Sequence, residues 1–63
     1  MAEVFFLYEN NSYLYDLKYS QLFQISNERL VEIDDLKTLQ NVRFNSVEIN
    51  KEQAFILARN LIE

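Results

Sequence analysis

Two short runs of strand-favouring residues stand on either side of a polar segment near the amino terminus. The runs cover residues 4–8 and 13–17, and the polar segment 9–12 lies between them. Aromatic and branched side chains favour extended strands, and asparagine tolerates the positive φ of a tight turn better than most residues. We therefore expect a β-hairpin with Asn10 and Asn11 at the centre of its turn.

That turn position sets a register and two faces for the hairpin. The expected register pairs Tyr8 with Tyr13, Phe6 with Tyr15, Val4 with Leu17 and, as an ion pair, Glu3 with Lys18. Because side chains alternate along a strand, one face is rich in tyrosine and the other is also apolar. The tyrosine-rich face carries Val4, Phe6, Tyr8, Tyr13, Tyr15 and Leu17. The opposite face carries Phe5, Leu7, Leu14 and Asp16.

Further along the chain, two more segments have the character of strands. Residues 21–25 and 30–33 are separated by the polar turn 26–29 and predict a second hairpin, which gives a four-strand meander. In residues 42–49 the apolar alternation changes phase. We expect either a tight turn at residues 45–46 between two very short strands or a β-bulge within one strand.

An acidic pair precedes a short apolar segment in the middle of the chain. Asp34 and Asp35 suit the N-cap of a short helix over residues 35–41, because a carboxylate there meets unpaired amides and the positive end of the helix dipole. Neighbouring helical side chains point apart, so we assign this pair to capping and not to metal binding or acid–base chemistry.

The last segment has a capping-box pattern, with Asn50 followed three positions later by Gln53. It predicts an amphipathic helix over residues 51–62 that covers one face of the sheet. Its apolar stripe carries Ala54, Leu57, Ala58, Leu61 and Ile62, with Phe55 at the edge. The predicted fold class is α+β: an antiparallel β-meander of four to five strands, a C-terminal amphipathic helix packed on one face, and a short helix at 35–41.

Composition limits the chemistry that this chain can perform. The sequence has 63 residues, which we take as a single domain (1–63), and it contains no Cys, His or Gly. Without these residues there is no Ser-His or Cys-His nucleophile pair, no thiolate metal site and no glycine-rich phosphate loop. We therefore expect no enzymatic activity, no cofactor and no metal; an active site would have to be assembled from several chains.

The net charge and the termini bear on location and partners. The formal net charge is −4, which disfavours non-specific attraction to nucleic acid or to anionic lipid. The acidic start Met1-Ala2-Glu3 and the short apolar run after it do not resemble an export signal, and no apolar stretch approaches the ~20 residues of a membrane span. We expect a cytoplasmic protein.

Two apolar faces and one long helix leave a surface that needs a cover. Tyr13, Tyr15 and Tyr19 could pack in the core, bind a protein or stack on nucleic-acid bases. The face that carries Phe5 would need the short helix or a second protein chain as its cover. On the C-terminal helix, Ile56 lies away from the apolar stripe and should be exposed. The candidate interaction surface comprises Phe5, Leu7, Leu14, Tyr13, Tyr15, Tyr19 and Ile56.

These features favour a small acidic protein–protein interaction module. Its partner would be a second copy of itself, as a homodimer, or another protein, as for phage or mobile-element inhibitors that block nucleic-acid-handling proteins. The alternative is a single-stranded nucleic-acid binder that uses the tyrosine-rich face. That alternative requires Lys18, Arg29 and Arg43 to converge despite the net negative charge.

Overall fold

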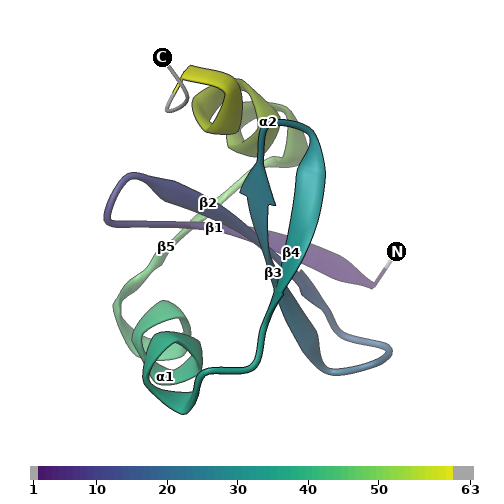
Figure 1. Ribbon diagram of the computed structural model, residues 1–63, viewed down its shortest axis with the longest axis vertical. Helices are drawn as coiled ribbons and strands as arrows, with labels where there is room; N and C mark the ends of the chain where they lie inside the picture. Colours follow the sequence, from purple (N-terminus) through teal and green to yellow (C-terminus); the bar gives the residue numbers. More distant parts are fainter. Residues whose placement is uncertain (1, 61–63) are drawn as a thin grey trace.

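A computed structural model describes residues 2–60 and shows an antiparallel five-stranded sheet with two helices (Figure 1). The elements follow in the order β1 (Glu3–Tyr8), β2 (Asn11–Asp16), β3 (Gln21–Ser26), β4 (Arg29–Ile33), α1 (Leu36–Asn45), β5 (Val47–Ile49) and α2 (Lys51–Asn60). The predicted α+β class, with a C-terminal helix packed against an antiparallel sheet, is confirmed.

The strand order across the sheet is β4-β3-β2-β1-β5. The first four strands form the predicted meander, and β5 then pairs with β1, placing Ile49 opposite Phe5 and Val47 opposite Leu7. This order puts β2 in the centre and leaves β4 and β5 as the two edges.

The first hairpin turns one residue earlier than the sequence predicts. Glu9 and Asn10 are the central residues, with φ of 48° and 66°, so the predicted register is wrong by two residues. The predicted ion pair is wrong too, because Glu3 lies opposite Asp16. The actual register places Phe5 opposite Leu14, two buried apolar side chains, whereas the predicted one would have placed Phe5 opposite a carboxylate. A shift of two residues leaves every side chain on its predicted face.

The Asp16 side chain stabilises the next turn instead. Its Oδ1 accepts from the backbone N–H of Lys18 at 2.9 Å and of Tyr19 at 3.3 Å. The second hairpin follows as predicted, with β3 and β4 joined by Asn27 and Glu28, whose φ angles are 51° and 68°. Two central residues with positive φ suit the right-handed twist of the flanking strands.

Helix α1 begins at the predicted cap and continues beyond the predicted end. The Thr38 amide donates to Asp35 Oδ2 at 2.7 Å. Hydrogen bonding by Thr38 lowers the pKa of the Asp35 carboxyl; the larger effect comes from the Thr38 side chain and the smaller one from its backbone amide. Both interpretations of residues 42–49 were wrong, because Val42 and Phe44 belong to α1 and only Val47–Ile49 is a strand.

Helix α2 opens with the predicted capping box. The Gln53 amide donates to Asn50 Oδ1 at 2.8 Å, and the Asn50 amide donates to Gln53 Oε1 at 3.2 Å. Ala54 and Ala58 of the predicted stripe are buried, whereas Leu61 and Ile62 lie outside the described residues.

The two helices lie on opposite sides of the sheet, so each face has its own core (Figure 1). Helix α2 covers the face that we expected to lack a cover. Its buried cluster comprises Phe5, Leu14, Ile25, Ala54 and Ala58. Helix α1 covers part of the tyrosine-rich face, in a cluster of Tyr13, Leu22 and Val42. The chain therefore supplies a cover for both faces.

Candidate functional site

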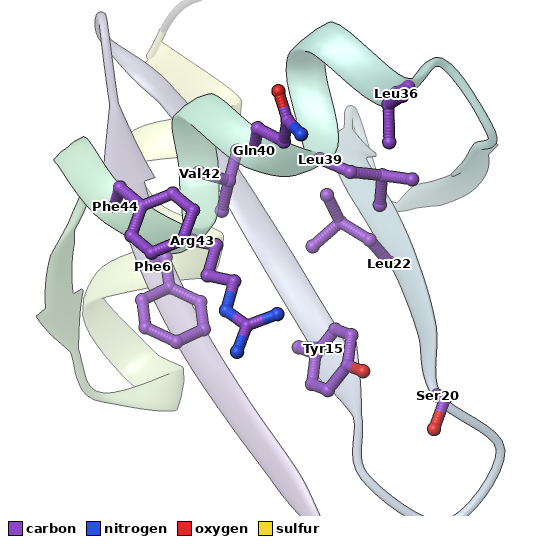
Figure 2. Close-up of a pocket in the computed structure, with 10 residues that line it drawn as sticks. All are labelled: Phe6, Tyr15, Ser20, Leu22, Leu36, Leu39, Gln40, Val42, Arg43 and Phe44. Atoms are coloured by element: carbon purple, nitrogen blue, oxygen red, sulfur yellow. The ribbon is translucent and has the colours of Figure 1, made fainter.

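A groove of about 710 Å³ lies between α1 and the tyrosine-rich face of the sheet (Figure 2). Its floor carries one side chain from each of three strands: Phe6 from β1, Tyr15 from β2 and Leu22 from β3. Its volume lies within the range of about 300–1,000 Å³ that is typical of ligand sites.

One side of α1 forms the wall of this groove. The lining residues from the helix are Leu36, Leu39, Gln40, Val42, Arg43 and Phe44. Leu39 and Val42 pack against the sheet, and Val42 is buried. Positions 36, 40 and 44 follow the i, i+4 spacing that aligns side chains along a helix. Leu36 and Phe44 stand at the two ends of this row and remain 67% and 71% exposed. The groove is thus bordered by two large apolar side chains that are open to solvent.

The groove carries a positive charge although the whole chain is acidic. The Arg43 side chain extends from α1 over the sheet, between Phe6 and Tyr15, and its guanidinium carbon lies 5.4 Å from the centroid of the Phe44 ring. Among residues 2–60 no carboxylate lines the groove, and the one ion pair of this range joins Arg59 to Glu28. A carboxylate entering the groove would therefore meet an available cation.

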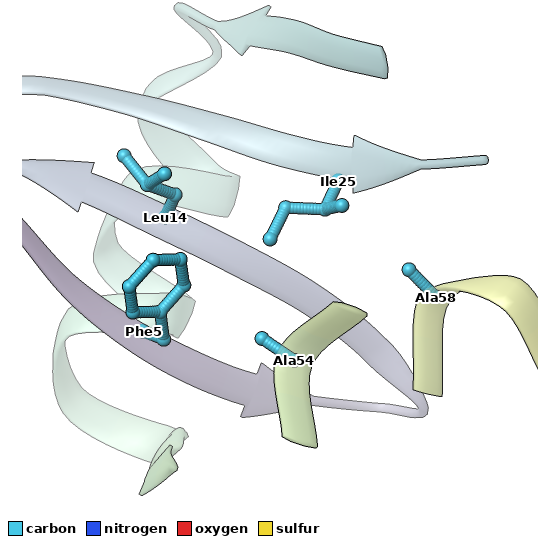
Figure 3. Close-up of a cluster of buried hydrophobic side chains, with 5 residues drawn as sticks. All are labelled: Phe5, Leu14, Ile25, Ala54 and Ala58. Carbon is cyan, nitrogen blue, oxygen red and sulfur yellow. The ribbon is translucent and has the colours of Figure 1, made fainter. Parts of the chain in front are cut away.

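Three predicted site residues belong to the interior. Figure 3 shows Phe5 and Leu14 beneath the side of α2 that carries Ala54 and Ala58. Tyr13 is equally buried on the other face, where burial, followed by the nearby Glu9 carboxylate, raises the pKa of its hydroxyl. Because their side chains are enclosed by the chain itself, these three residues cannot form a docking surface.

The other four predicted residues do not come together. Tyr15 lines the groove, Leu7 is half-buried on the opposite face, and Tyr19 is exposed in the turn after β2, where the Lys18 ammonium lies 5.3 Å from its ring. Ile56 is exposed, as predicted, but belongs to α2 on the other side of the sheet. Of the predicted set, only Tyr15 takes part in the groove.

The helical wall could not be foreseen while the alternation of Val42 and Phe44 was interpreted as a strand after residue 41. Read at a helical period, Leu36, Gln40 and Phe44 share one side with Arg43, and this pattern would have placed two large apolar residues and one cation on the same side of a helix.

The cations required for nucleic-acid binding do not converge. Lys18 lies in the turn before β3, and Arg29 follows the turn after it. They stand at opposite ends of a six-residue strand, so roughly 16–20 Å of sheet separates them. Within the described residues no three acidic side chains gather to hold a metal ion.

Comparison with models of protein families gives no match, and comparisons with curated proteins and with solved structures give none either. Neither helix of the described residues is long and apolar enough to cross a membrane.

Proposed function

We propose that this chain is a non-enzymatic, cytoplasmic protein–protein interaction module that holds an apolar segment of another protein in the groove beside α1. The observation that carries the proposal is the exposure of Leu36 and Phe44 at the two ends of an apolar groove. Exposed apolar side chains that border a concave surface are typical of protein-binding sites.

The groove sets the size of the segment that it can hold. Leu36 and Phe44 stand about 12 Å apart along the helix axis, at 1.5 Å per residue. That length fits about two turns of a partner helix or about four residues of an extended strand. The floor of Phe6, Tyr15 and Leu22 would then contact one row of apolar side chains from the partner.

Arg43 gives the partner a second requirement. Its guanidinium group lies over the floor of the groove, and a carboxylate on the partner could accept hydrogen bonds from it. We therefore propose a partner segment that combines apolar side chains with Asp, Glu or a free carboxyl terminus. The net charge of −4 acts at longer range and favours a basic surface around that segment. This long-range attraction to a basic surface supports a narrower form of the proposal, in which the chain inhibits a nucleic-acid-handling protein.

Panning of a displayed random peptide library against the chain tests this function. We expect the selected peptides to contain apolar residues and at least one carboxylate. Phe44→Ala and Leu36→Ala should each weaken binding of a synthesised peptide about tenfold, since both remove exposed apolar contacts at the rim. Arg43→Gln should weaken it severalfold at low salt and less at high salt.

Ile56→Ala provides the matched control, because Ile56 is also an exposed apolar residue but belongs to α2 on the opposite side. Its peptide affinity should equal that of the wild type. The proposal is wrong if panning selects no peptide, or if Ile56→Ala weakens binding as much as Phe44→Ala.

A further inference from the structure

The two edges of the sheet differ in how well they are protected from other strands. Edge β5 has three residues, whereas edge β4 has five, in continuous register with β3. Natural edge strands are usually shortened, bulged or protected by Pro, Lys or a covering element. Strand β4 contains neither Pro nor Lys, and within the described residues it packs mainly against β3. As far as residues 2–60 are concerned, its outer edge is therefore open to another strand.

Strand β4 also exposes apolar side chains on both faces. Leu30 points to the face that α2 covers and is 50% exposed, and Val31 points to the opposite face and is 51% exposed. Both side chains would lose contact with water if another strand lay alongside.

The hairpin geometry determines which backbone groups face outward. In a two-residue hairpin the residues that flank the turn form a hydrogen-bonded pair, here Ser26 and Arg29. Hydrogen-bonded and non-hydrogen-bonded pairs then alternate, so Val31 and Ile33 bond to β3. The amides and carbonyls of Leu30 and Glu32 point away from the sheet. Strand β4 thus presents a ready row of donors and acceptors to a new strand.

We propose that β4 pairs with β4 of a second copy of this chain, antiparallel, about a two-fold axis that passes between the two Val31 residues. In this register Leu30 lies opposite Glu32 of the second copy, and Arg29 lies opposite Ile33. Both outward-facing residues of each strand then gain backbone hydrogen bonds, and the two sheets become continuous. A two-fold axis perpendicular to the sheet keeps like faces together, so both grooves open on the same side.

The sequence of β4 suits a second copy of itself, because its outward-facing residues Leu30 and Glu32 pair with each other in this register and the strand has no net charge. Strand β4 contains Arg29 and Glu32 and is neutral, although the chain carries −4, so two copies meet where their repulsion is weakest. The register places neither charge opposite a like charge. Just beyond the strands Glu28 meets Asp34 of the second copy, and Arg59, 3.8 Å from Glu28, offsets that contact.

Sedimentation equilibrium from micromolar to millimolar concentration tests the pairing. We expect the molar mass to rise from 7.6 kDa toward twice that value. Glu32→Pro removes an outward N–H and leaves the bonds to β3 intact, whereas Glu32→Ala removes the same side chain and keeps the N–H. The proline variant should raise the dissociation constant of the dimer at least about tenfold relative to the alanine variant.

A second pair of variants covers the case in which the proline variant does not fold. Val31→Lys places two ammonium groups at the two-fold axis and should abolish the dimer, whereas Val47→Lys, at an exposed position of edge β5, should not. A chain that stays at 7.6 kDa at millimolar concentration overturns the inference, and so does equal weakening by both lysine variants. A monomer that still binds selected peptides would overturn the pairing alone and leave the groove proposal standing.

Discussion

Replacement of Leu14 by alanine should remove a large part of the stability of this domain. Leu14 is 6% exposed, lies in the central strand β2, and stands opposite Phe5 on one side and Phe23 on the other, beneath α2. Buried Leu→Ala changes cost about 2–5 kcal/mol, through lost transfer free energy and the cavity left behind. A domain of 63 residues has about 3–9 kcal/mol of total stability, at about 0.05–0.15 kcal/mol per residue. We expect a loss of about 3 kcal/mol.

Urea unfolding followed by far-ultraviolet circular dichroism measures this change as a lower transition midpoint with an unchanged slope. Leu17→Ala is the matched control, because Leu17 is 54% exposed in the turn after the same strand. Its free energy of unfolding should change by about 0.5 kcal/mol or less. If Leu14→Ala changed the free energy by less than about 1 kcal/mol, or by less than Leu17→Ala, Leu14 would not lie in a core beneath α2.

Three further substitutions test single interactions. Asn50→Ala should lower the free energy of unfolding by about 1 kcal/mol, because it removes the α2 cap, and an unchanged urea midpoint would contradict that role. Ser12→Ala should raise stability by about 1 kcal/mol in the same assay, since the Ser12 hydroxyl is fully buried and has no hydrogen-bond partner within the described residues; a loss of stability would refute this. The lowered pKa of Asp35 means that its contribution is present above its ordinary pKa of 3.8 and is lost as pH falls through the lowered value. An asparagine at position 35 can cap the helix but does not titrate. The free energy of unfolding of Asp35→Asn should therefore fall less than that of the wild type between pH 6 and pH 3, and an equal fall in both proteins would contradict the lowered pKa of Asp35.

The hairpins could be predicted because their apolar alternation and their polar turns point to the same structure. The first register could not be predicted from local preference alone. Asparagine is favoured at positive φ, yet the two turn residues with positive φ are Glu9 and Asn10, and Asn11 belongs to β2. The earlier turn brings Phe5 opposite Leu14 and lets Asp16 accept from the next turn. Core packing outweighed the turn preference of a single residue.

The second half of α1 could not be recognised because residues 42–45 fit the two-residue period of a strand as well as the 3.6-residue period of a helix. Val42 and Phe44 alternate as in a strand, and both are strand-favouring residues. In the fold, Val42 lies one turn after Leu39 and packs with it against the sheet. This error hid the groove, since Arg43 and Phe44 join Leu36 on one side of the helix only when the segment is helical.

The sequence also could not predict which face of the sheet α2 covers. Both faces of the first hairpin are apolar, so hydrophobic pattern alone does not favour one over the other. The face that α2 covers depends on the direction in which the chain turns after β5, which pairs with β1 at the edge of the sheet. The sequence pattern predicted either two very short strands or one bulged strand over residues 42–49 and did not indicate that residues 47–49 pair with β1, so this connection could not be traced.

Nuclear Overhauser effects between side-chain protons test most directly whether each helix covers its own face of the sheet. We expect the Ala54 and Ala58 methyl groups to show contacts with Phe5 and Ile25, and the Val42 methyl groups to show contacts with Tyr13 and Leu22. Contacts from the α2 alanines to Tyr13 or Leu22 would mean that α2 covers the tyrosine-rich face. The groove beside α1 and the function proposed for it would then be wrong.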